Sequence, residues 1–302
     1  MIKNKELPYS LYSILHPTCI TSISQYGSEV FGYNSYDSFF KLYLRAARSF
    51  LGLPKSVTSF GVVSELDWLL PQSQTHIKMI QYLGRIFRTS NERLMVKVFN
   101  WDRKLDESGS IRTWSSEIKE ILNAHNLSSI FERAVIFPVK NIVAQLKTSM
   151  MEKQIDLTKA ECLAKPKLRT FVRFKDFGTL PSHLGKPLSF IERKTLSKLR
   201  LGILPLRIET GRYLRPVLPE EQRLCYCNSG EIESEIHVLF SCCMYANLRQ
   251  QWLNTLDIPL NFNDLPIDEK LKLTLNKAEN IRPTAQFLVS LMDLRSLLNK
   301  TY

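Results

Sequence analysis

Long apolar segments are missing from this sequence. No window among its 302 residues reaches the ~18 uninterrupted apolar residues of a membrane-spanning helix. The first stretch, MIKNKELPYSLYSILHPTCITSIS at residues 1–24, also lacks the apolar run of a secretory signal. We therefore expect a nuclear or cytoplasmic protein that is not secreted and has no membrane partner.

Cysteine is also scarce, and its distribution is uneven. Six cysteines are too few for a disulfide scaffold in a chain of this length, and four of them fall within residues 223–245. Cys19 and Cys162 lie apart from the others, and we expect both to be buried as small hydrophobic side chains. Glycine-rich phosphate loops are absent too, because GSEVFG at residues 27–32 matches neither P-loop nor dinucleotide-binding spacing.

The remaining composition is that of an ordinary globular protein. Hydrophobic residues make up 44% and charged residues 23% of the chain, which predicts a folded rather than a disordered protein. Single cores rarely grow beyond about 250 residues, so 302 residues suggest two compact units, or one large unit with an appendage.

The hydrophobic pattern is mainly helical. In NSYDSFFKLYLRAARSFLGLPKS, residues 34–56, apolar side chains recur at helical spacing after a candidate cap at Asn34 or Ser35. Pro138 is suited to open a longer helix over residues 138–157. These two segments predict an α-helical protein.

The segment between residues 165 and 190 has a different pattern. KPKLRTFVRFKDFGTLPSHLGKPLSF is rich in aromatic residues, glycine and proline, and it shows little helical period. It predicts loops with short strands. Ser189 and Glu192 then form the spacing of a capping box, which predicts a helix start directly after this segment.

Positive charge is abundant and concentrated. The net charge is +12, and residues 165–215 contain thirteen basic residues against three acidic ones. Such a segment favours a polyanionic partner, most often nucleic acid and sometimes an anionic membrane surface. The candidate phosphate-contacting residues are Lys165, Lys167, Arg169, Arg173, Lys175, Arg193, Lys194, Lys198, Arg200, Arg207, Arg212 and Arg215. We expect the predicted helix after Ser189 to turn its basic side chains outward.

Aromatic residues interleave with these charges. Phe171, Phe174, Phe177 and Tyr213 lie in the basic segment, where aromatic rings can stack on unpaired bases. Ordinary core packing explains the same rings equally simply, so both interpretations stay open.

The segment RLCYCNSGEIESEIHVLFSCCMY, residues 223–245, has the composition of a metal site. Its candidate ligands are Cys225, Cys227, His237 and Cys242, since tetrahedral zinc is held by thiolates and imidazoles. Cys225 and Cys227 are one residue closer than in the usual C-x-x-C knuckle, and five positions separate His237 from Cys242. The alternative is a small core of reduced thiols in which His237 is hydrogen-bonded.

Two catalytic interpretations also fit the residue types. Cys242 or Cys243 with His237 could form a nucleophile and base, but such pairs are assembled in space and cannot be recognised from local sequence. The acidic residues in NFNDLPIDEKLK, residues 261–272, could belong to a nuclease site, although carboxylates are equally typical of a helix start.

Several segments together resemble a known family. They are YGSEVFGYNSYDSFFKLYLRAARSFLGLPKSV, VVSELDWLLPQSQTHIKMIQYLGRIF, KPKLRTFVRFKDFG, LPLRIETGRY and RLCYCNSGEIESEIHVLFSCCMYANLR. This order is similar to the C-terminal region of LINE-like, non-LTR retrotransposon reverse transcriptases, from the thumb-side helices through the zinc-binding segment. Cys227, His237 and Cys242 fall on the family pattern, whereas Cys225 departs from it by one position and Cys243 stands where proline is common.

The resemblance implies a fold and a division of the chain. The expected fold is mainly α, with a helical thumb-like bundle, a basic connector and a small zinc-knuckle-like Cys/His segment flanked by helices. The expected regions are a thumb-like helical region at 1–135, a connecting helix at 136–160, a basic nucleic-acid-contact region at 161–222, a Cys/His segment at 223–250 and C-terminal helices at 251–302.

The resemblance also implies a function without catalysis. The polymerase palm of this family uses an aspartate pair to hold two metal ions, and this chain has no Asp-Asp dipeptide. We therefore expect a non-enzymatic binder of RNA or DNA with low sequence specificity, zinc as its cofactor, and a separate polymerase polypeptide as a further potential partner. The alternatives are a helical protein-interaction or structural module and an inert truncated retroelement product.

Overall fold

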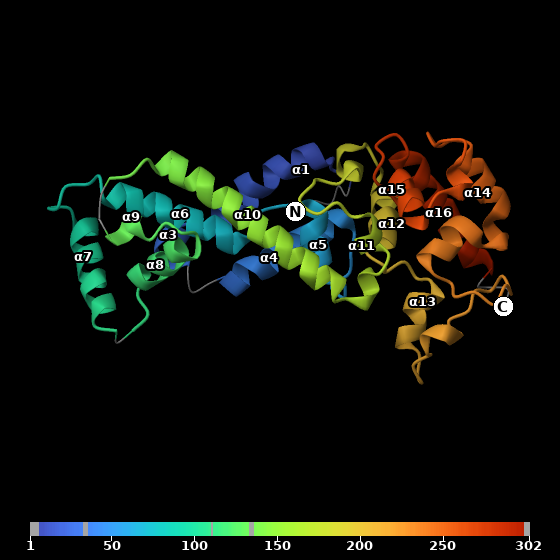
Figure 1. The fold of residues 1–302 in the computed structure, drawn as a ribbon, viewed down its shortest axis with the longest axis horizontal. Helices are drawn as coiled ribbons and strands as arrows, with labels where there is room; N and C mark the ends of the chain where they lie inside the picture. The colour runs from blue at the N-terminus through green and yellow to red at the C-terminus, as the bar shows by residue number, and fades with distance from the viewer. Residues whose placement is uncertain (1–5, 33–35, 110, 133–135, 299–302) are drawn as a thin grey trace. The chain divides into compact units, whose positions relative to one another are not determined.

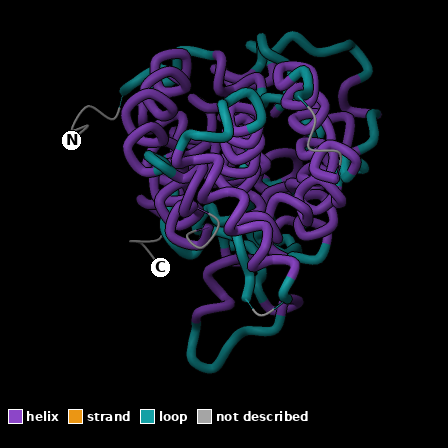
Figure 2. Tube along the Cα trace, turned by 90° about the vertical axis from the view of Figure 1, so that its left-hand side faces the viewer, coloured by secondary structure: helices purple, strands orange, loops and turns teal. Residues whose placement is uncertain are grey.

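The computed structural model describes residues 6–32, 36–109, 111–132 and 136–298, and over these ranges the protein is mainly helical. Figure 2 shows the described trace as helix and loop alone, and its one β pairing is an isolated antiparallel bridge between Leu224 and Ile232. The expected mainly α class, with helices flanking the Cys/His segment, is confirmed. None of the helices in these ranges is both long enough and apolar enough to span a membrane.

The helices follow one another along the chain as labelled in Figure 1. The first half contains α1 (Tyr9–Leu15), η1 (His16–Thr21), α2 (Ser22–Ser24), α3 (Ser28–Phe31), α4 (Tyr36–Leu51), α5 (Ser59–Leu66), α6 (Pro71–Ile86), α7 (Leu94–Glu107), α8 (Trp114–Ala124), α9 (Ser129–Glu132) and α10 (Val139–Leu163). The second half contains η3 (Pro166–Leu168), α11 (Phe171–Phe174), η4 (Ser182–Gly185), α12 (Phe190–Arg200), α13 (Arg207–Thr210), η5 (Gly211–Tyr213), η6 (Glu220–Gln222), η7 (His237–Ser241), η8 (Cys243–Tyr245), α14 (Ala246–Leu253), η9 (Phe262–Asp264), α15 (Ile267–Leu275) and α16 (Ile281–Leu298).

Contacts within the chain define two compact units. Unit 1 consists of residues 1–14, 45–67 and 157–302, and unit 2 consists of residues 15–44 and 68–156. The division falls inside α4 and α10, so each of these helices contributes to both units. The predicted region 1–135 is therefore shared between the units, because segments distant in sequence pack together.

Unit 2 is built around the apolar faces of α6, α7, α8 and α10. α6 packs against α3, α7 and α8. The buried core contains Ile77, Ile80, Leu83, Phe99, Ile118, Leu122, Leu146 and Met150. Phe99 lies edge-on to both Trp114 and Phe131, at centroid separations of 5.9 Å and 6.1 Å, a geometry that aromatic pairs favour.

Unit 1 is organised around its C-terminal helix. α16 packs against α12, α14 and α15, and α15 also contacts α11. Trp252 of α14 stacks on Phe287 of α16 with centroids 4.3 Å apart, and its indole nitrogen donates to Thr284 Oγ1 at 3.2 Å. The ring is thereby buried with its polar atom satisfied.

Local expectations for single helices agree with the structure. α4 ends at Leu51 as its apolar spacing predicts, while the candidate caps Asn34 and Ser35 lie outside the described residues. α10 begins directly after Pro138. At α12, the Ser189 amide donates to Glu192 at 2.7 Å and the Glu192 amide donates to Ser189 Oγ at 3.3 Å, so the capping box is confirmed.

The predicted strands in residues 165–190 are wrong. This segment forms η3, α11 and η4 instead. The reason is tertiary packing: Phe171 and Phe174 lie three positions apart in α11, both are fully buried, and their rings meet edge-on at 5.8 Å. A helical turn places both rings on the same side, where a strand would separate them.

Candidate metal centre

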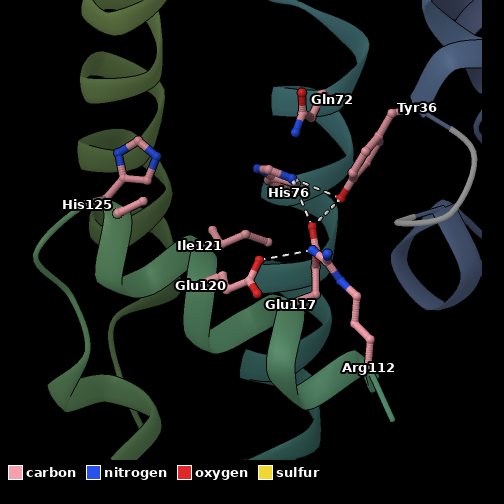
Figure 3. A pocket seen from close by; sticks show the side chains of 9 residues that line it. Tyr36, Gln72, His76, Arg112, Glu117, Glu120, Ile121 and His125 are labelled. Atoms are coloured by element: carbon pink, nitrogen blue, oxygen red, sulfur yellow. Dashed lines mark hydrogen bonds and ion pairs between the residues drawn. The ribbon is translucent and has the colours of Figure 1, made fainter.

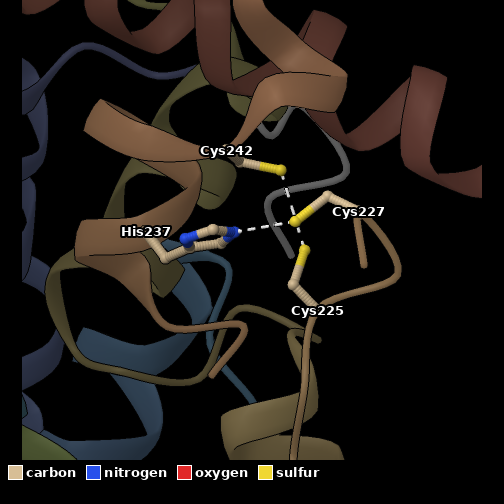
Figure 4. Close-up of side chains that lie close together, drawn as sticks. All are labelled: Cys225, Cys227, His237 and Cys242. Carbon is tan, nitrogen blue, oxygen red and sulfur yellow. Dashed lines mark hydrogen bonds between the residues drawn. The ribbon is translucent and has the colours of Figure 1, made fainter. Parts of the chain in front are cut away.

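Four side chains converge at the Cys/His segment of unit 1. One ligand atom from each of Cys225, Cys227, His237 and Cys242 lies within 4.8 Å of all the others, so the group could hold a metal ion. Figure 4 shows the three sulfur atoms and the imidazole facing a common point. Cys225 Sγ is 3.6 Å from Cys242 Sγ, and Cys227 Sγ is 3.4 Å from His237 Nε2. These thiols are reduced, since a disulfide would bring sulfur atoms to ~2.05 Å.

A tight hairpin presents the first two cysteines. The Cys225 amide donates to the Glu231 carbonyl at 2.8 Å, and the Glu233 amide donates to the Arg223 carbonyl at 3.0 Å. The loop reverses through Asn228 and Gly230, whose φ values of 59° and 78° are left-handed and are tolerated by these residue types. The short C-x-C spacing is therefore accommodated by a hairpin instead of the usual knuckle.

A π-helical turn presents the other two residues. In an α-helix, positions five apart point about 140° away from each other, which makes the spacing of His237 and Cys242 unfavourable. Here η7 is π-helical, and the Cys242 amide donates to the His237 carbonyl at 2.8 Å, the five-residue bond that defines this turn. The wider turn returns Cys242 to the side of His237.

The imidazole is oriented by an acidic neighbour. His237 Nδ1 forms a short hydrogen bond with the Glu231 carboxylate, and Nε2 faces the thiols. Burial alone would lower the pKa of His237, but the hydrogen bonds with Cys227 and Glu231 raise it. A carboxylate on the second imidazole nitrogen is typical of metal-ligating histidines, because it fixes the tautomer and the ring orientation.

The thiols differ in their tendency to ionise. The hydrogen bond with Cys242, together with burial, raises the pKa of Cys225, whereas the same bond lowers the pKa of Cys242. Burial would raise the pKa of Cys227, but hydrogen bonds from Ser229 and His237 lower it. Two of the three thiols thus favour the thiolate form that binds metals.

Two buried ion pairs anchor this segment, and the sequence did not reveal them. Glu233 is 1% exposed and accepts from Arg295 Nε and from an Arg295 terminal nitrogen, both at 2.8 Å. Glu235 is fully buried and accepts from Arg169 at 2.9 Å and from Thr170 at 3.1 Å. The alternating glutamates in EIESEIH could have indicated that acidic side chains are buried here. Their basic partners could not be identified, because they lie more than 60 positions away in the sequence.

The remaining cysteines are placed differently from one another. Cys162 is buried, as predicted, but Cys19 is exposed, so that prediction is wrong. Cys19 lies in the π-helical segment η1, whose inward position is taken by His16. Cys243 is exposed, and its Sγ is 3.8 Å from the Cys227 carbonyl oxygen, outside the four-residue group.

Several predicted nucleic-acid contacts are buried, which corrects those predictions. The corrected residues, each 7% exposed or less, are Lys175, Arg193, Arg200, Phe171 and Phe174. Arg200 binds Glu65 through Nε at 3.0 Å and 3.1 Å and the Leu275 carbonyl at 2.7 Å. Arg193 donates to the Phe50 carbonyl at 3.0 Å. These arginines point inward because the core of unit 1 supplies partners for them.

A second set of predicted cations is partly or fully exposed, and its members contact acidic or aromatic side chains. Lys167 lies 2.8 Å from Glu209, and Arg212 lies 3.3 Å from the same carboxylate. The other pairs are Arg169 with Glu235, Arg173 with Asp268 at 2.6 Å, and Lys165 with Glu161 at 3.9 Å. Arg207 lies over the Tyr226 ring at 4.8 Å, and Lys167 lies over Tyr213 at 5.0 Å.

Three predicted cations keep their charge uncompensated. Lys194 and Lys198, one turn apart on α12, are partly exposed, and Arg215 is exposed. No acidic side chain of the described residues lies within ion-pair distance of any of the three. Burial, and then the neighbouring charge of Lys194, lowers the pKa of Lys198. Tyr213, a predicted stacking residue, is 60% exposed.

The acidic stretch at residues 261–272 has a structural explanation. α15 begins at Ile267, so Asp268 and Glu269 fall in its first turn, where the helix dipole favours carboxylates. Asp268 also pairs with Arg173.

Known proteins offer no guide to this arrangement. Comparisons with family models, with curated proteins and with solved structures found no match for the chain. The function must therefore be inferred from the geometry and charge of the side chains themselves.

Proposed function

We propose that this protein binds RNA or DNA without catalysing a reaction, and that a zinc ion held by Cys225, Cys227, His237 and Cys242 stabilises the unit that binds. The observation that carries the proposal is the pair Lys194 and Lys198 on α12. These two like charges lie one turn apart, and no acidic side chain among the described residues is within ion-pair distance of either. Adjacent like charges on a helix destabilise it, whereas phosphates would neutralise both.

Zinc suits the metal group in both donor type and spacing. Three sulfur atoms and one imidazole nitrogen are a common tetrahedral zinc set. With Zn–S bonds of about 2.3 Å and Zn–N bonds of about 2.0 Å, the edges of the tetrahedron are about 3.8 Å between sulfurs and about 3.5 Å between sulfur and nitrogen. The Cys225–Cys242 and Cys227–His237 separations of 3.6 Å and 3.4 Å are close to these edges, and every other pair of ligand atoms lies within 4.8 Å. A closed set of four protein ligands supports a structural ion, since catalytic zinc keeps an open position.

The metal group is adjacent to exposed groups that suit nucleic acid. Tyr226 lies between two of the proposed ligands and is 37% exposed, with Arg207 over its ring. Tyr213 is exposed in the same unit. Aromatic rings beside cations can stack on bases while the charge meets phosphate.

The family resemblance gives a proposed origin. The order of KPKLRTFVRFKDFG, LPLRIETGRY and the Cys/His segment supports descent from the C-terminal region of a non-LTR retrotransposon reverse transcriptase. The absence of an Asp-Asp dipeptide supports a protein without polymerase activity. The purified chain should not extend a primer on an RNA template.

The test is binding to single-stranded and duplex RNA and DNA across a salt series. Lys194→Glu with Lys198→Glu should weaken binding, and it should lower the slope of log affinity against log salt by about 2 if each lysine meets one phosphate. The matched control is Lys159→Glu with Lys272→Glu, which makes the same charge change at exposed positions of unit 1. Equal losses in both variants, or no binding by the unmodified protein in dilute buffer, would refute the proposal.

A protein-interaction module remains the second candidate, and one observation favours it. In unit 2, Leu94, Val98 and Trp101 of α7 are 76%, 53% and 63% exposed at helical spacing. An exposed apolar stripe of this kind is typical of a protein-binding surface. Salt-independent pull-down of a protein, with no affinity for nucleic acid, would favour this candidate.

A further inference from the structure

Unit 2 contains a cavity with a mixed polar and apolar lining that the proposed function does not use. Its volume is about 440 Å³, within the range typical of small-molecule sites. The lining residues come from α4, α6 and α8 and their flanking loops; they are Tyr36, Gln72, His76, Arg112, Glu117, Glu120, Ile121, Ala124 and His125. Figure 3 shows these side chains from close by.

The floor of the cavity is a fixed network around Glu117. This residue is 4% exposed. Tyr36 donates its hydroxyl hydrogen to Glu117 Oε1 at 2.9 Å, and Arg112 Nε donates to Oε2 at 3.2 Å. Burial would raise the pKa of Glu117, but hydrogen bonds from His76, Arg112 and Tyr36 lower it to about 2. Glu117 is therefore ionised and its partners are held in place.

This network determines which atom His76 presents to the cavity. A tyrosine hydroxyl has one hydrogen, and Tyr36 gives it to Glu117, so the Tyr36 oxygen must accept from His76 Nε2 at 2.9 Å. In neutral His76 the proton then resides on Nε2, and Nδ1 is an acceptor. Figure 3 shows this second nitrogen on the side of the ring away from Tyr36, facing the side where His125 lies.

The lining also carries an excess of negative charge. Arg112 forms ion pairs with both Glu117 and Glu120, the second at 2.9 Å, so two carboxylates share one guanidinium. Burial lowers the pKa of His125, and the charge of Lys153 lowers it further, so this ring is neutral at pH 7. Glu120 Oε1 and His76 Nδ1 have no hydrogen-bond partner in the described part of the chain.

We propose that this cavity binds a small aliphatic amine. An ammonium group carries a positive charge and donates three hydrogen bonds, which suits the Glu120 carboxylate and His76 Nδ1. Ile121 and Ala124 provide an apolar wall for the methylene chain. An inorganic anion would meet the Glu120 carboxylate and an imidazole lone pair, which both repel it, and the Arg112 guanidinium of the lining is already paired with Glu117 and Glu120. The net charge of +12 acts weakly on the ligand, because charges beyond about 8 Å are screened at physiological salt.

The test is calorimetric titration of the full chain with 1,4-diaminobutane and with butylamine at pH 7.4 and about 0.15 M salt. We expect saturable binding of an amine at one site per chain, and inorganic phosphate should not compete with it. Glu120→Gln should weaken amine binding by about tenfold or more, since a hydrogen bond to a charged group is lost. Glu120 is exposed, and its loss removes one surface ion pair, so this variant should fold.

The matched control is Glu107→Gln, the same chemical change at an exposed position of α7 outside the lining. It should bind the amine as the unmodified protein does. Absence of amine binding up to about 10 mM, displacement of the amine by phosphate, or equal affinity in Glu120→Gln and the unmodified protein would each overturn the proposal. None of these results bears on nucleic-acid binding by unit 1.

Discussion

Replacing Cys242 should release zinc from the protein and destabilise unit 1. The Cys242→Ser change removes one thiolate from the four-ligand group and leaves Cys225 Sγ without its neighbour at 3.6 Å. Cys243→Ser is the matched control, because Cys243 is the adjacent residue, is exposed and lies outside the ligand group. Purified protein should contain one zinc per chain, Cys243→Ser should retain it, and Cys242→Ser should lose it.

The size of the effect depends on how far the zinc concentration exceeds the dissociation constant. The Cys225 Sγ–Cys242 Sγ and Cys227 Sγ–His237 Nε2 separations lie ~0.2 Å or less from the edges of a zinc tetrahedron, and all four ligand atoms lie within 4.8 Å of one another. Zinc at 100 times its dissociation constant stabilises the folded state by about 2.7 kcal/mol. For a unit of this size each kcal/mol corresponds to about 2–4 °C, so the melting temperature should fall by about 5–11 °C on metal removal.

The measurement combines metal analysis with scanning calorimetry, before and after chelation. Chelator should lower the melting temperature of the unmodified protein and of Cys243→Ser, and it should leave Cys242→Ser unchanged. Acid should release the ion as well, because metal binding requires deprotonated ligands. Loss of zinc from Cys243→Ser with retention by Cys242→Ser, or an unchanged melting temperature after chelation, would show that the ligand assignment is mistaken.

Two further predictions concern buried charge. Glu65→Gln leaves the buried Arg200 without its carboxylate and should cost about 3–5 kcal/mol of unfolding free energy. The partly exposed control Glu161→Gln should cost about 0–1 kcal/mol. Urea denaturation measures both, and similar costs would contradict the burial argument. Glu117 has a folded pKa of about 2, below its ordinary value of 4.5, so its contribution to unit 2 is complete above pH 4.5 and is lost as the pH falls toward 2. The stability difference between the unmodified protein and Glu117→Gln should therefore shrink over this interval, and a constant difference would refute the assignment.

Local sequence was sufficient where the interactions are local. The capping box of Ser189 and Glu192 spans three positions, and the helix start after Pro138 depends on one residue. The four proposed ligands lie within eighteen positions, so their association could be predicted from spacing. The backbone geometry that brings these four side chains together could not be predicted from spacing. A hairpin presents Cys225 and Cys227 instead of the usual knuckle, and a π-helical turn places Cys242 on the same side as His237.

The sequence by itself determined the helical class, the concentration of positive charge and the identity of the thiol and imidazole groups, because periodicity, composition and spacing are properties of the chain. Only the tertiary structure decided which cations remain available. Arg200 pairs with Glu65, which lies 135 positions away in the sequence, and Glu233 pairs with Arg295, which lies 62 positions away. A buried guanidinium must have a partner, and the partner is known only when the segments have packed. Three basic residues of α12 therefore differ in environment: Arg200 forms a buried ion pair, whereas Lys194 and Lys198 are partly exposed and have no acidic partner among the described residues.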